Sequence, residues 1–247
     1  MAHSALPLTA LILAGGLGTR LRPVVSDRPK PMALVNGIPF LEILIDSLAG
    51  KGIQRFVVLT GYLGDVIESH FGELHARSVE IEFSREDTPL GTGGAVKHAE
   101  EFASDPSLLV NGDTFFDGDI EELLRFHKEK RASVTLSLLA VMDVSRYGAV
   151  VVDNEGRVTG FREKDNRRNG QGLINAGLSL LSKEFIMSLP SGIAFSMEKE
   201  IFPSLALSGK MFGLAQSRPF FDIGTPDSYE AFKRFVSERG NQSMVSK

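Results

Sequence analysis

The chain contains no cysteine among its 247 residues. Disulfide bonds, zinc sites built from thiolates and cysteine nucleophiles are therefore excluded. Its five histidines lack the spacing of a metal-ligand set, and no serine stands in the Gly-x-Ser-x-Gly pattern of a nucleophile elbow. Covalent catalysis by a thiolate or by such a serine is thus disfavoured from the outset.

Long apolar runs are also missing. No stretch reaches the length needed to span a membrane, and the first residues lack the pattern of a signal peptide. We therefore expect a cytoplasmic protein with no membrane partner. The formal net charge of −4 disfavours a general nucleic-acid-binding surface. An anionic ligand would then need cationic side chains that are concentrated locally.

The length suits one large α/β domain, and we expect residues 1–247 to form a single domain. Apolar strand-like runs alternate with amphipathic helical stretches through its first half. This alternation predicts a Rossmann-like, mainly parallel mixed sheet that is flanked by helices on both faces. In such sheets, ligands bind at the carboxyl ends of the strands.

The first half spans about residues 8–132. Its expected strands are 8–14, 56–60, 79–84 and 108–110, and its expected helices are 40–51, 66–72, 95–102 and 120–130. The second half, about 133–238, is predicted to supply antiparallel strands and a lid over the site. Its expected strands are 133–141, 148–152, 156–161, 173–181 and 220–223, with helices at 183–189, 197–205 and 227–238. Residues 1–4 and 240–247 are expected to be disordered.

A glycine-rich loop follows the first strand, within residues 11–23 (LILAGGLGTRLRP). Gly15, Gly16 and Gly18 allow backbone N–H groups to approach a ligand closely, and such a loop can surround phosphate oxygens. Arg20 follows the loop and can bind phosphate in a fork, while Lys30 lies between two prolines that stiffen its segment. Together these residues predict a polyphosphate site.

Two better-known phosphate loops do not fit. A P-loop requires Lys and then Ser or Thr after its last glycine, whereas Thr19 and Arg20 follow Gly18 here. The dinucleotide fingerprint requires a third glycine where this chain has Leu21.

Two aspartates stand beside apolar runs. Asp113 follows the strand at 108–110, and Asp222 is flanked by apolar residues. Either one alone would be interpreted as a turn or cap residue. As a pair in a chain with a phosphate loop, they predict one shared Mg²⁺, which prefers carboxylate, phosphate and water oxygens. Asp119, by contrast, is expected to cap the helix that begins at Ile120.

A second glycine loop, residues 87–95 (DTPLGTGGA), opens a helix. We interpret it as the segment that reads a planar base edge, and it is also expected to form a tight strand-to-helix turn. Asn175 is an amide within an apolar strand. Sugar hydroxyls and buried backbone groups are equally good partners for it, and the sequence does not decide between them.

The GGxGTRLxP segment and the Pro-Lys-Pro that follows it resemble the signature of the sugar-1-phosphate nucleotidyltransferases, and the resemblance extends from Leu11 to about Phe235. It implies a GT-A-like fold with an antiparallel sugar-binding portion, and Mg²⁺ held by Asp113 and Asp222. The implied catalytic residues are Arg20, Lys30 and Asp113. The implied nucleotide-binding residues are Leu13, Ala14, Gly15, Gly16, Gly18, Thr19, Arg20, Lys30, Thr88, Pro89, Gly91, Thr92 and Gly112. The implied sugar-phosphate-binding residues are Gly148, Glu163, Lys164 and Asn175.

Within this family, residues 89–95, 111–117, 172–177 and 221–226 are most similar to members that use GTP and D-glycero-α-D-manno-heptose 1-phosphate. The resemblance therefore implies transfer of GMP to that sugar, with release of pyrophosphate, for surface polysaccharide biosynthesis. Mannose 1-phosphate or another hexose 1-phosphate is the alternative acceptor. Whether the protein forms a homo-oligomer is left open.

Two hypotheses from other classes compete with this interpretation. A nucleotide-sensing regulatory subunit could keep the fold without turnover, but the intact Arg20 and Lys30 argue against it. A glycosyltransferase would need an Asp-x-Asp motif, and residues 117–119 (DGD) have that spacing. They lie beyond the strand end, however, and the first glycine loop would have no role in such an enzyme.

Overall fold

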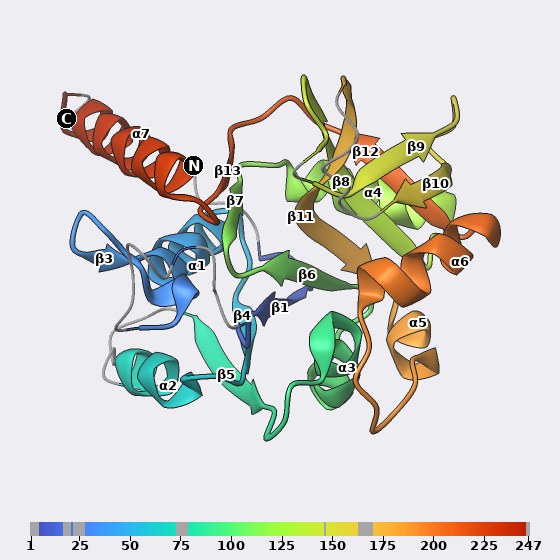
Figure 1. Cartoon of the computed structure of the whole chain (residues 1–247), viewed down its shortest axis with the longest axis horizontal. Helices are drawn as coiled ribbons and strands as arrows, with labels where there is room; N and C mark the ends of the chain where they lie inside the picture. The colour runs from blue at the N-terminus through green and yellow to red at the C-terminus, as the bar shows by residue number, and fades with distance from the viewer. Residues whose placement is uncertain are drawn as a thin grey trace.

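The computed structural model describes residues 5–16, 21, 28–72, 79–145, 147–162 and 170–245. A nine-stranded mixed sheet forms its centre, with the order β10-β9-β11-β6-β1-β4-β5, while β8 pairs with β11 and β12. Helices lie on both sides of this sheet (Figure 1). The expected architecture, a mainly parallel sheet with flanking helices and an antiparallel portion, is confirmed.

Four neighbouring strands form the parallel part: β6 (Ser107–Asn111), β1 (Thr9–Leu13), β4 (Arg55–Thr60) and β5 (Glu80–Arg85). Their side chains alternate between the two faces, as the period of a strand requires. In β1, Ala10 and Ile12 belong to one buried cluster and Leu11 to the other. Both faces of β1 are therefore covered, which explains why it is a continuous apolar run. The edge strand β5, by contrast, contains Glu80, Glu82 and Arg85.

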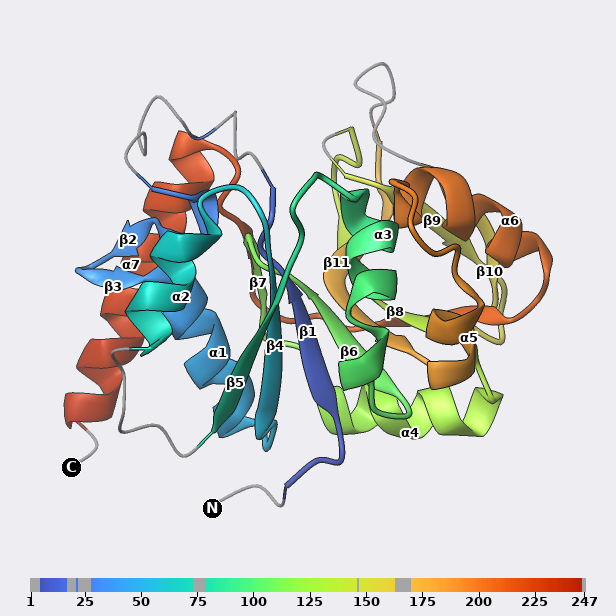
Figure 2. The same cartoon turned by 90° about the horizontal axis from the view of Figure 1, so that it is seen from below.

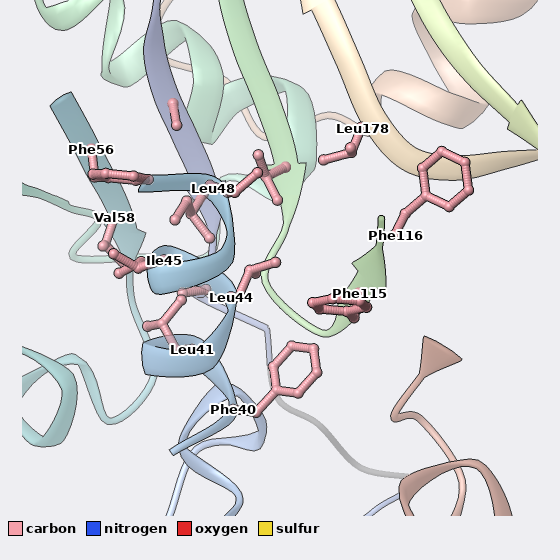
Figure 3. Packing of buried hydrophobic residues seen from close by; sticks show 14 of the residues in the cluster. Phe40, Leu41, Leu44, Ile45, Leu48, Phe56, Val58, Phe115, Phe116 and Leu178 are labelled. Carbon is pink, nitrogen blue, oxygen red and sulfur yellow. The ribbon is translucent and has the colours of Figure 1, made fainter. Parts of the chain in front are cut away.

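The helices α1 (Phe40–Gly50), α2 (Gly64–Gly72) and α7 (Pro226–Val245) lie on one side of the parallel strands (Figure 2). In α1, one apolar stripe is fully or almost fully buried and packs toward β4 and β7 (Figure 3). Its members recur at helical spacing and are Phe40, Leu41, Leu44, Ile45 and Leu48. Burial of each such side chain contributes about 1.5–3 kcal/mol.

The other face is covered by α3 (Gly91–His98), α5 (Lys183–Ser188) and α6 (Phe202–Leu207). Short helical turns adjoin them at η2 (Glu100–Phe102) and at η3 (Met197–Ile201), which is π-helical. The expected helix at 95–102 thus begins earlier, within the second glycine loop. The helix α4 (Ile120–Lys130) packs against β8 and β12, and Asp119 caps it as expected, accepting from the Glu122 N–H at 2.9 Å.

The second half supplies β8 (Val134–Val141), β9 (Ala149–Val152), β10 (Val158–Arg162) and β11 (Gly172–Leu181), which pair antiparallel. One unexpected strand, β12 (Met211–Ala215), joins this part by pairing parallel with β8. The antiparallel portion is attached to the parallel one where β11 pairs with β6. One continuous sheet therefore spans both halves of the chain.

Two small ribbons complete the fold, and of their four strands only β13 was expected, as the strand at 220–223. The pair β2 (Leu34–Val35) and β3 (Ile38–Pro39) follows the short turn η1 (Lys30–Met32). The pair β7 (Thr114–Phe116) and β13 (Phe220–Asp222) joins segments that are about a hundred residues apart in sequence. The strands β2, β3 and β7 are too short to give a clear alternation in the sequence.

The C-terminal helix α7 continues to Val245, so the disordered tail expected from residue 240 is wrong for residues 240–245. A single glycine costs a helix only about 1 kcal/mol relative to alanine, so Gly240 need not end it. In the described ranges, no helix combines the length and the apolar character that crossing a bilayer would require.

Candidate active site

A cleft of ≈ 480 Å³ lies at the carboxyl edge of the parallel strands. One wall is formed by residues at or just after the ends of β1, β4, β5 and β6, and the opposite wall comes from the second half of the chain. The position agrees with the rule that ligands bind at this edge of an open α/β sheet.

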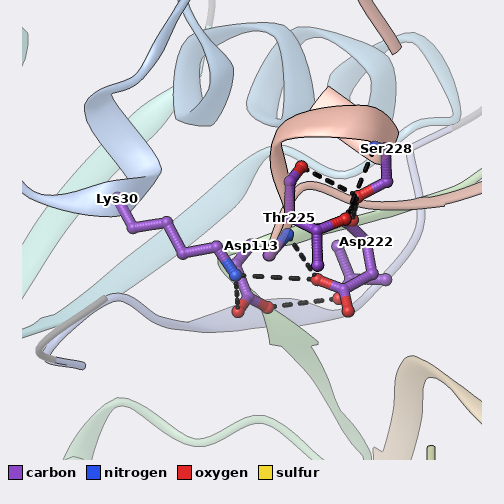
Figure 4. A network of polar contacts seen from close by, with 7 residues as sticks. Lys30, Asp113, Asp222, Thr225 and Ser228 are labelled. Carbon is purple, nitrogen blue, oxygen red and sulfur yellow. Dashed lines mark hydrogen bonds and ion pairs between the residues drawn. The ribbon is translucent and has the colours of Figure 1, made fainter. Parts of the chain in front are cut away.

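Two carboxylates of the cleft lining, Asp113 and Asp222, share one cation, the Lys30 ammonium (Figure 4). The Lys30 Nζ lies 2.6 Å from Asp113 Oδ2 and 3.6 Å from Asp222 Oδ1. The side chain of Lys30 is only 9% exposed, that of Asp222 11% and that of Asp113 39%. A charge this deeply buried is stable only when it is paired, and here each charge has an opposite partner.

The β7–β13 ribbon brings these two aspartates together. Asp113 immediately precedes β7, Asp222 ends β13, and the Ile223 N–H donates to the Asp113 carbonyl at 3.1 Å. The Asp222 carboxylate accepts from the Gly224 N–H at 2.8 Å, and the Thr114 hydroxyl donates to Asp113 Oδ1 at 3.1 Å. The carboxylates are therefore held by their own ribbon as well as by Lys30.

Most of the residues predicted for the site that the structure describes do line the cleft. They are Leu13, Gly15, Gly16, Pro89, Gly91, Thr92, Gly112, Asp113, Gly148, Asn175 and Asp222. Three others do not line it: Ala14 is buried with its N–H donating to the Leu59 carbonyl at 2.9 Å, and Thr88 is exposed at the surface. Lys30 lies behind the lining, where it contacts Asp113 and Asp222. The predicted residues Gly18, Thr19, Arg20, Glu163 and Lys164 lie outside the described residues.

Close backbone contacts explain two glycines of the site. A Cβ at Gly112 would stand 2.4 Å from the Leu13 carbonyl oxygen, where β1 and β6 meet at the cleft. Gly91 has φ +71°, and a Cβ there would stand 2.5 Å from the Phe195 carbonyl oxygen. The second glycine loop thus forms the tight strand-to-helix turn that was expected of it.

Glu86 also lines the cleft, and its carboxylate was not among the predicted site residues. It follows β5 directly, so the strand-end rule that located Asp113 could have found it. Its Oε2 accepts from the Leu90 N–H at 3.1 Å. A Cβ at Gly15 or at Gly61 would stand 3.0 or 2.8 Å from its Oε1, so both glycines leave room for it. Burial raises the pKa of Glu86, although the Leu90 bond opposes the shift.

The far wall carries further polar groups. At a bulge in β11, the Asn175 side-chain oxygen accepts from the Gly177 N–H at 3.1 Å. This contact satisfies the oxygen and leaves the amide nitrogen as a donor toward a ligand. Glu198, on η3, was not predicted either; its Oε2 accepts from the Thr92 hydroxyl at 2.6 Å and thereby ties the second glycine loop to the second half.

Known proteins with similar sequences and structures fit this description. The chain is 38% identical over 224 residues to a mannose-1-phosphate guanylyltransferase of Mycobacterium tuberculosis, a match that covers 89% of this chain but only 62% of that protein. It is 37% identical over 228 residues to a D-glycero-alpha-D-manno-heptose 1-phosphate guanylyltransferase of Campylobacter jejuni, covering 91% of this chain and 98% of the other.

A solved structure gives the same result. HddC from Yersinia pseudotuberculosis, complexed with GMP-PN, superimposes with a TM-score of 0.81 at 34% identity, covering 92% of this chain and 99% of the other. Residues 9–239 also match the family described as Nucleotidyl transferase, which is nearly the whole chain. The chain therefore belongs to the nucleotidyl transferase family.

Proposed function

We propose that the protein transfers GMP from GTP to D-glycero-α-D-manno-heptose 1-phosphate and releases pyrophosphate. The observation that carries the choice of nucleotide is the Glu86 carboxylate in the wall of the cleft, beside Gly15 of the first glycine loop. The product would be GDP-heptose, a donor for surface polysaccharide biosynthesis.

Glu86 supports guanine because of the groups at its Watson–Crick edge. Guanine presents an N1–H and a 2-amino group there, and a carboxylate can accept from both. Adenine presents a ring-nitrogen acceptor at the same place, which would face the carboxylate without a hydrogen bond. Leaving such buried polar groups unmatched costs about 1–3 kcal/mol each, enough to reject the wrong base.

The chemistry needs no general base. A phosphate monoester is already anionic near neutral pH, so an oxygen of the sugar phosphate can attack the α-phosphorus in line with the departing pyrophosphate. The protein's task is then to position the two substrates and to neutralise their charge. We assign this neutralisation to Lys30, which contacts two carboxylates of the cleft lining, and, from the family resemblance, to Arg20.

The donor set also fits Mg²⁺. Two carboxylates already share one cation, and Mg²⁺ is commonly bound by one or two carboxylates together with substrate phosphates and water. Within the described ranges, no group of three or more acidic or histidine side chains could form a complete metal cage. When bound, Mg²⁺ would supply charge stabilisation at the phosphates, with Asp113 and Asp222 as its protein ligands.

The heptose assignment is supported by the Campylobacter jejuni relative, which this chain covers almost end to end. Mannose 1-phosphate remains the second candidate, because the Mycobacterium tuberculosis relative is about as similar in sequence although the chain spans only 62% of it. On the sugar side we assign Asn175 and Gly148, which line the far wall, together with Glu163 and Lys164 from the family resemblance.

The proposal is tested by mixing the protein with GTP, Mg²⁺ and the heptose 1-phosphate. We expect equal amounts of pyrophosphate and GDP-heptose, measured by an enzyme-coupled assay and by mass spectrometry. GTP binding without either product would instead indicate a nucleotide-sensing subunit. Consumption of a nucleotide sugar in place of GTP would indicate a glycosyltransferase.

A further inference from the structure

We infer that the Lys30 ammonium is a stand-in for the catalytic metal: it holds the carboxylates of Asp113 and Asp222 while no metal is bound, and it is displaced when one binds. The displaced ammonium is then available to the substrate phosphates. The inference rests on the proposed function, which assigns the same two carboxylates to Mg²⁺.

The first support is the geometry of the three charges. A single nitrogen lies 2.6 Å from one carboxylate and 3.6 Å from the other, and both its own side chain and that of Asp222 are largely buried. Two carboxylates this close would repel each other if no cation lay between them. A divalent ion at the same carboxylates would in turn repel the ammonium.

The second support is that the carboxylates do not depend on Lys30 for their positions. The Gly224 N–H donates to Asp222 Oδ1 at 2.8 Å, and the Thr114 hydroxyl donates to Asp113 Oδ1 at 3.1 Å. These donors belong to the β7–β13 ribbon and the turn after it, whereas Lys30 begins the separate segment η1. The ammonium can therefore leave without losing the ribbon that aligns both carboxylates.

The third support is the space around the cation. A Cβ at Gly224 would stand 2.7 Å from Asp222 Oδ1 and 3.1 Å from Lys30 Nζ, so glycine keeps this side open. Meanwhile the backbone of Lys30 is fixed between two prolines, but its four-carbon side chain can rotate. Exchange then requires movement of the side chain and no rearrangement of the fold.

The direct test is amine labelling of the nucleotide-free protein. A limiting dose of acetic anhydride is applied with and without Mg²⁺, and acetylation of each lysine is measured by mass spectrometry. We expect Mg²⁺ to increase the labelling of Lys30 severalfold. Lys51 is the internal control, and its labelling should not change. Its Nζ pairs with Asp117 Oδ1 at 2.8 Å, and neither residue lines the cleft. Unchanged or decreased labelling of Lys30 at saturating Mg²⁺ would overturn the inference.

A second test measures Mn²⁺ affinity by calorimetry, again without nucleotide. Lys30→Gln keeps a hydrogen-bond donor but removes the charge, and Lys30→Met is the alternative if that variant does not fold. Either should bind Mn²⁺ about tenfold more tightly than the wild type, because an ion pair no longer has to be broken. Lys51→Met should not change the affinity. Equal or weaker binding by both Lys30 variants would contradict displacement.

These outcomes separate the inference from the proposed function. If GDP-heptose forms but Lys30 labelling does not respond to Mg²⁺, only the displacement is wrong. If Lys30 is displaced but no nucleotide sugar forms, the proposed reaction is wrong and the displacement stands. Failure of the wild type to bind Mn²⁺ or Mg²⁺ would overturn the displacement together with the metal assignment.

Discussion

At the scale of single residues, two neighbouring aspartates have different roles: we assign Asp113 to the reaction and Asp117 to the stability of the fold. Asp113 and Asp117 lie on either side of the short strand β7. Asp113 faces the cleft and Lys30, whereas Asp117 pairs with Lys51 at 2.8 Å and with Arg239 at 2.5 Å. Despite burial, these two cations lower the pKa of Asp117. The two aspartates should therefore respond differently to the same substitution.

Asp113→Asn should reduce turnover by about a hundredfold or more, because several kcal/mol of transition-state stabilisation are lost. Its circular dichroism spectrum should remain native. Asp117→Asn is the matched control: it should lose about 1–2 kcal/mol of stability and retain its turnover. Near-normal turnover of Asp113→Asn at limiting Mg²⁺ would refute the metal assignment.

The Glu86→Gln variant tests whether the Glu86 carboxylate recognises guanine. The amide replaces one acceptor with a donor, so kcat/KM for GTP should fall by about tenfold to a hundredfold while that for ATP falls less. Burial raises the pKa of Glu86, so GTP binding by the wild type should weaken as the pH is lowered through that raised value. Glu82→Gln, which alters a carboxylate bonded to Arg55 outside the cleft lining, is the control. An unchanged GTP-to-ATP ratio in Glu86→Gln would exclude this role.

At the scale of elements, long apolar strands and helices could be predicted from the sequence, whereas the short strands β2, β3 and β7 could not. The buried stripe of α1 recurs with a helical period, and β1 is a continuous apolar run, so the positions of both follow from hydrophobicity alone. The ribbon β7–β13 has only three residues in each strand, and its pairing depends on tertiary contacts. The sequence could therefore predict that Asp113 and Asp222 act together, but not that Lys30 lies between them.

Glu86 and Glu198 illustrate the same limit at the cleft. Glu86 matters because two distant glycines leave space for its carboxylate, and Glu198 because η3 packs beside Thr92. The position of Glu86 just after β5 could have marked it as a candidate, but its contacts could not be predicted, and Glu198 belongs to no local motif. Their roles come from contacts between segments that are far apart in the chain.

Two glycines that line the cleft, Gly112 and Gly16, give a prediction at this scale. Gly112→Ala would place a Cβ 2.4 Å from the Leu13 carbonyl, whereas a Cβ at Gly16 would have nothing within 4 Å. We expect Gly112→Ala to lose about 1–3 kcal/mol of stability through overpacking. Gly16→Ala should keep the wild-type melting temperature but raise KM for GTP, since phosphate must approach that backbone.

Thermal melts and GTP kinetics of both variants provide the check. A wild-type melting temperature for Gly112→Ala would mean that the junction of β1 and β6 is less rigid than described. An unchanged KM for Gly16→Ala would remove the first glycine loop from the nucleotide site.

At the scale of the whole molecule, stability should depend on pH through His127. This side chain is only 5% exposed, and its Nδ1 contacts the Thr135 hydroxyl at 2.8 Å. Burial lowers its pKa from 6.5 to about 4. Between these values the unfolded chain takes up a proton that the folded protein does not, so stability falls as the pH is lowered, by at most about 3 kcal/mol.

Urea unfolding of the wild type and of His127→Gln from pH 7 to pH 4 measures this contribution. The wild type should lose more free energy of unfolding over this range than the variant, because carboxylates titrate in both and cancel in the difference. Parallel curves for the two proteins would show that His127 is not held neutral by the fold.

At the same scale, we propose that the one cleft binds guanine beside Glu86 and the heptose at its opposite wall. The most direct test of this proposal is kcat/KM for heptose and mannose 1-phosphates, each with GTP, ATP, CTP and UTP. We predict the highest value for GTP with D-glycero-α-D-manno-heptose 1-phosphate, and little turnover with either pyrimidine nucleotide. A clear preference for mannose 1-phosphate, or for any nucleotide other than GTP, would contradict it.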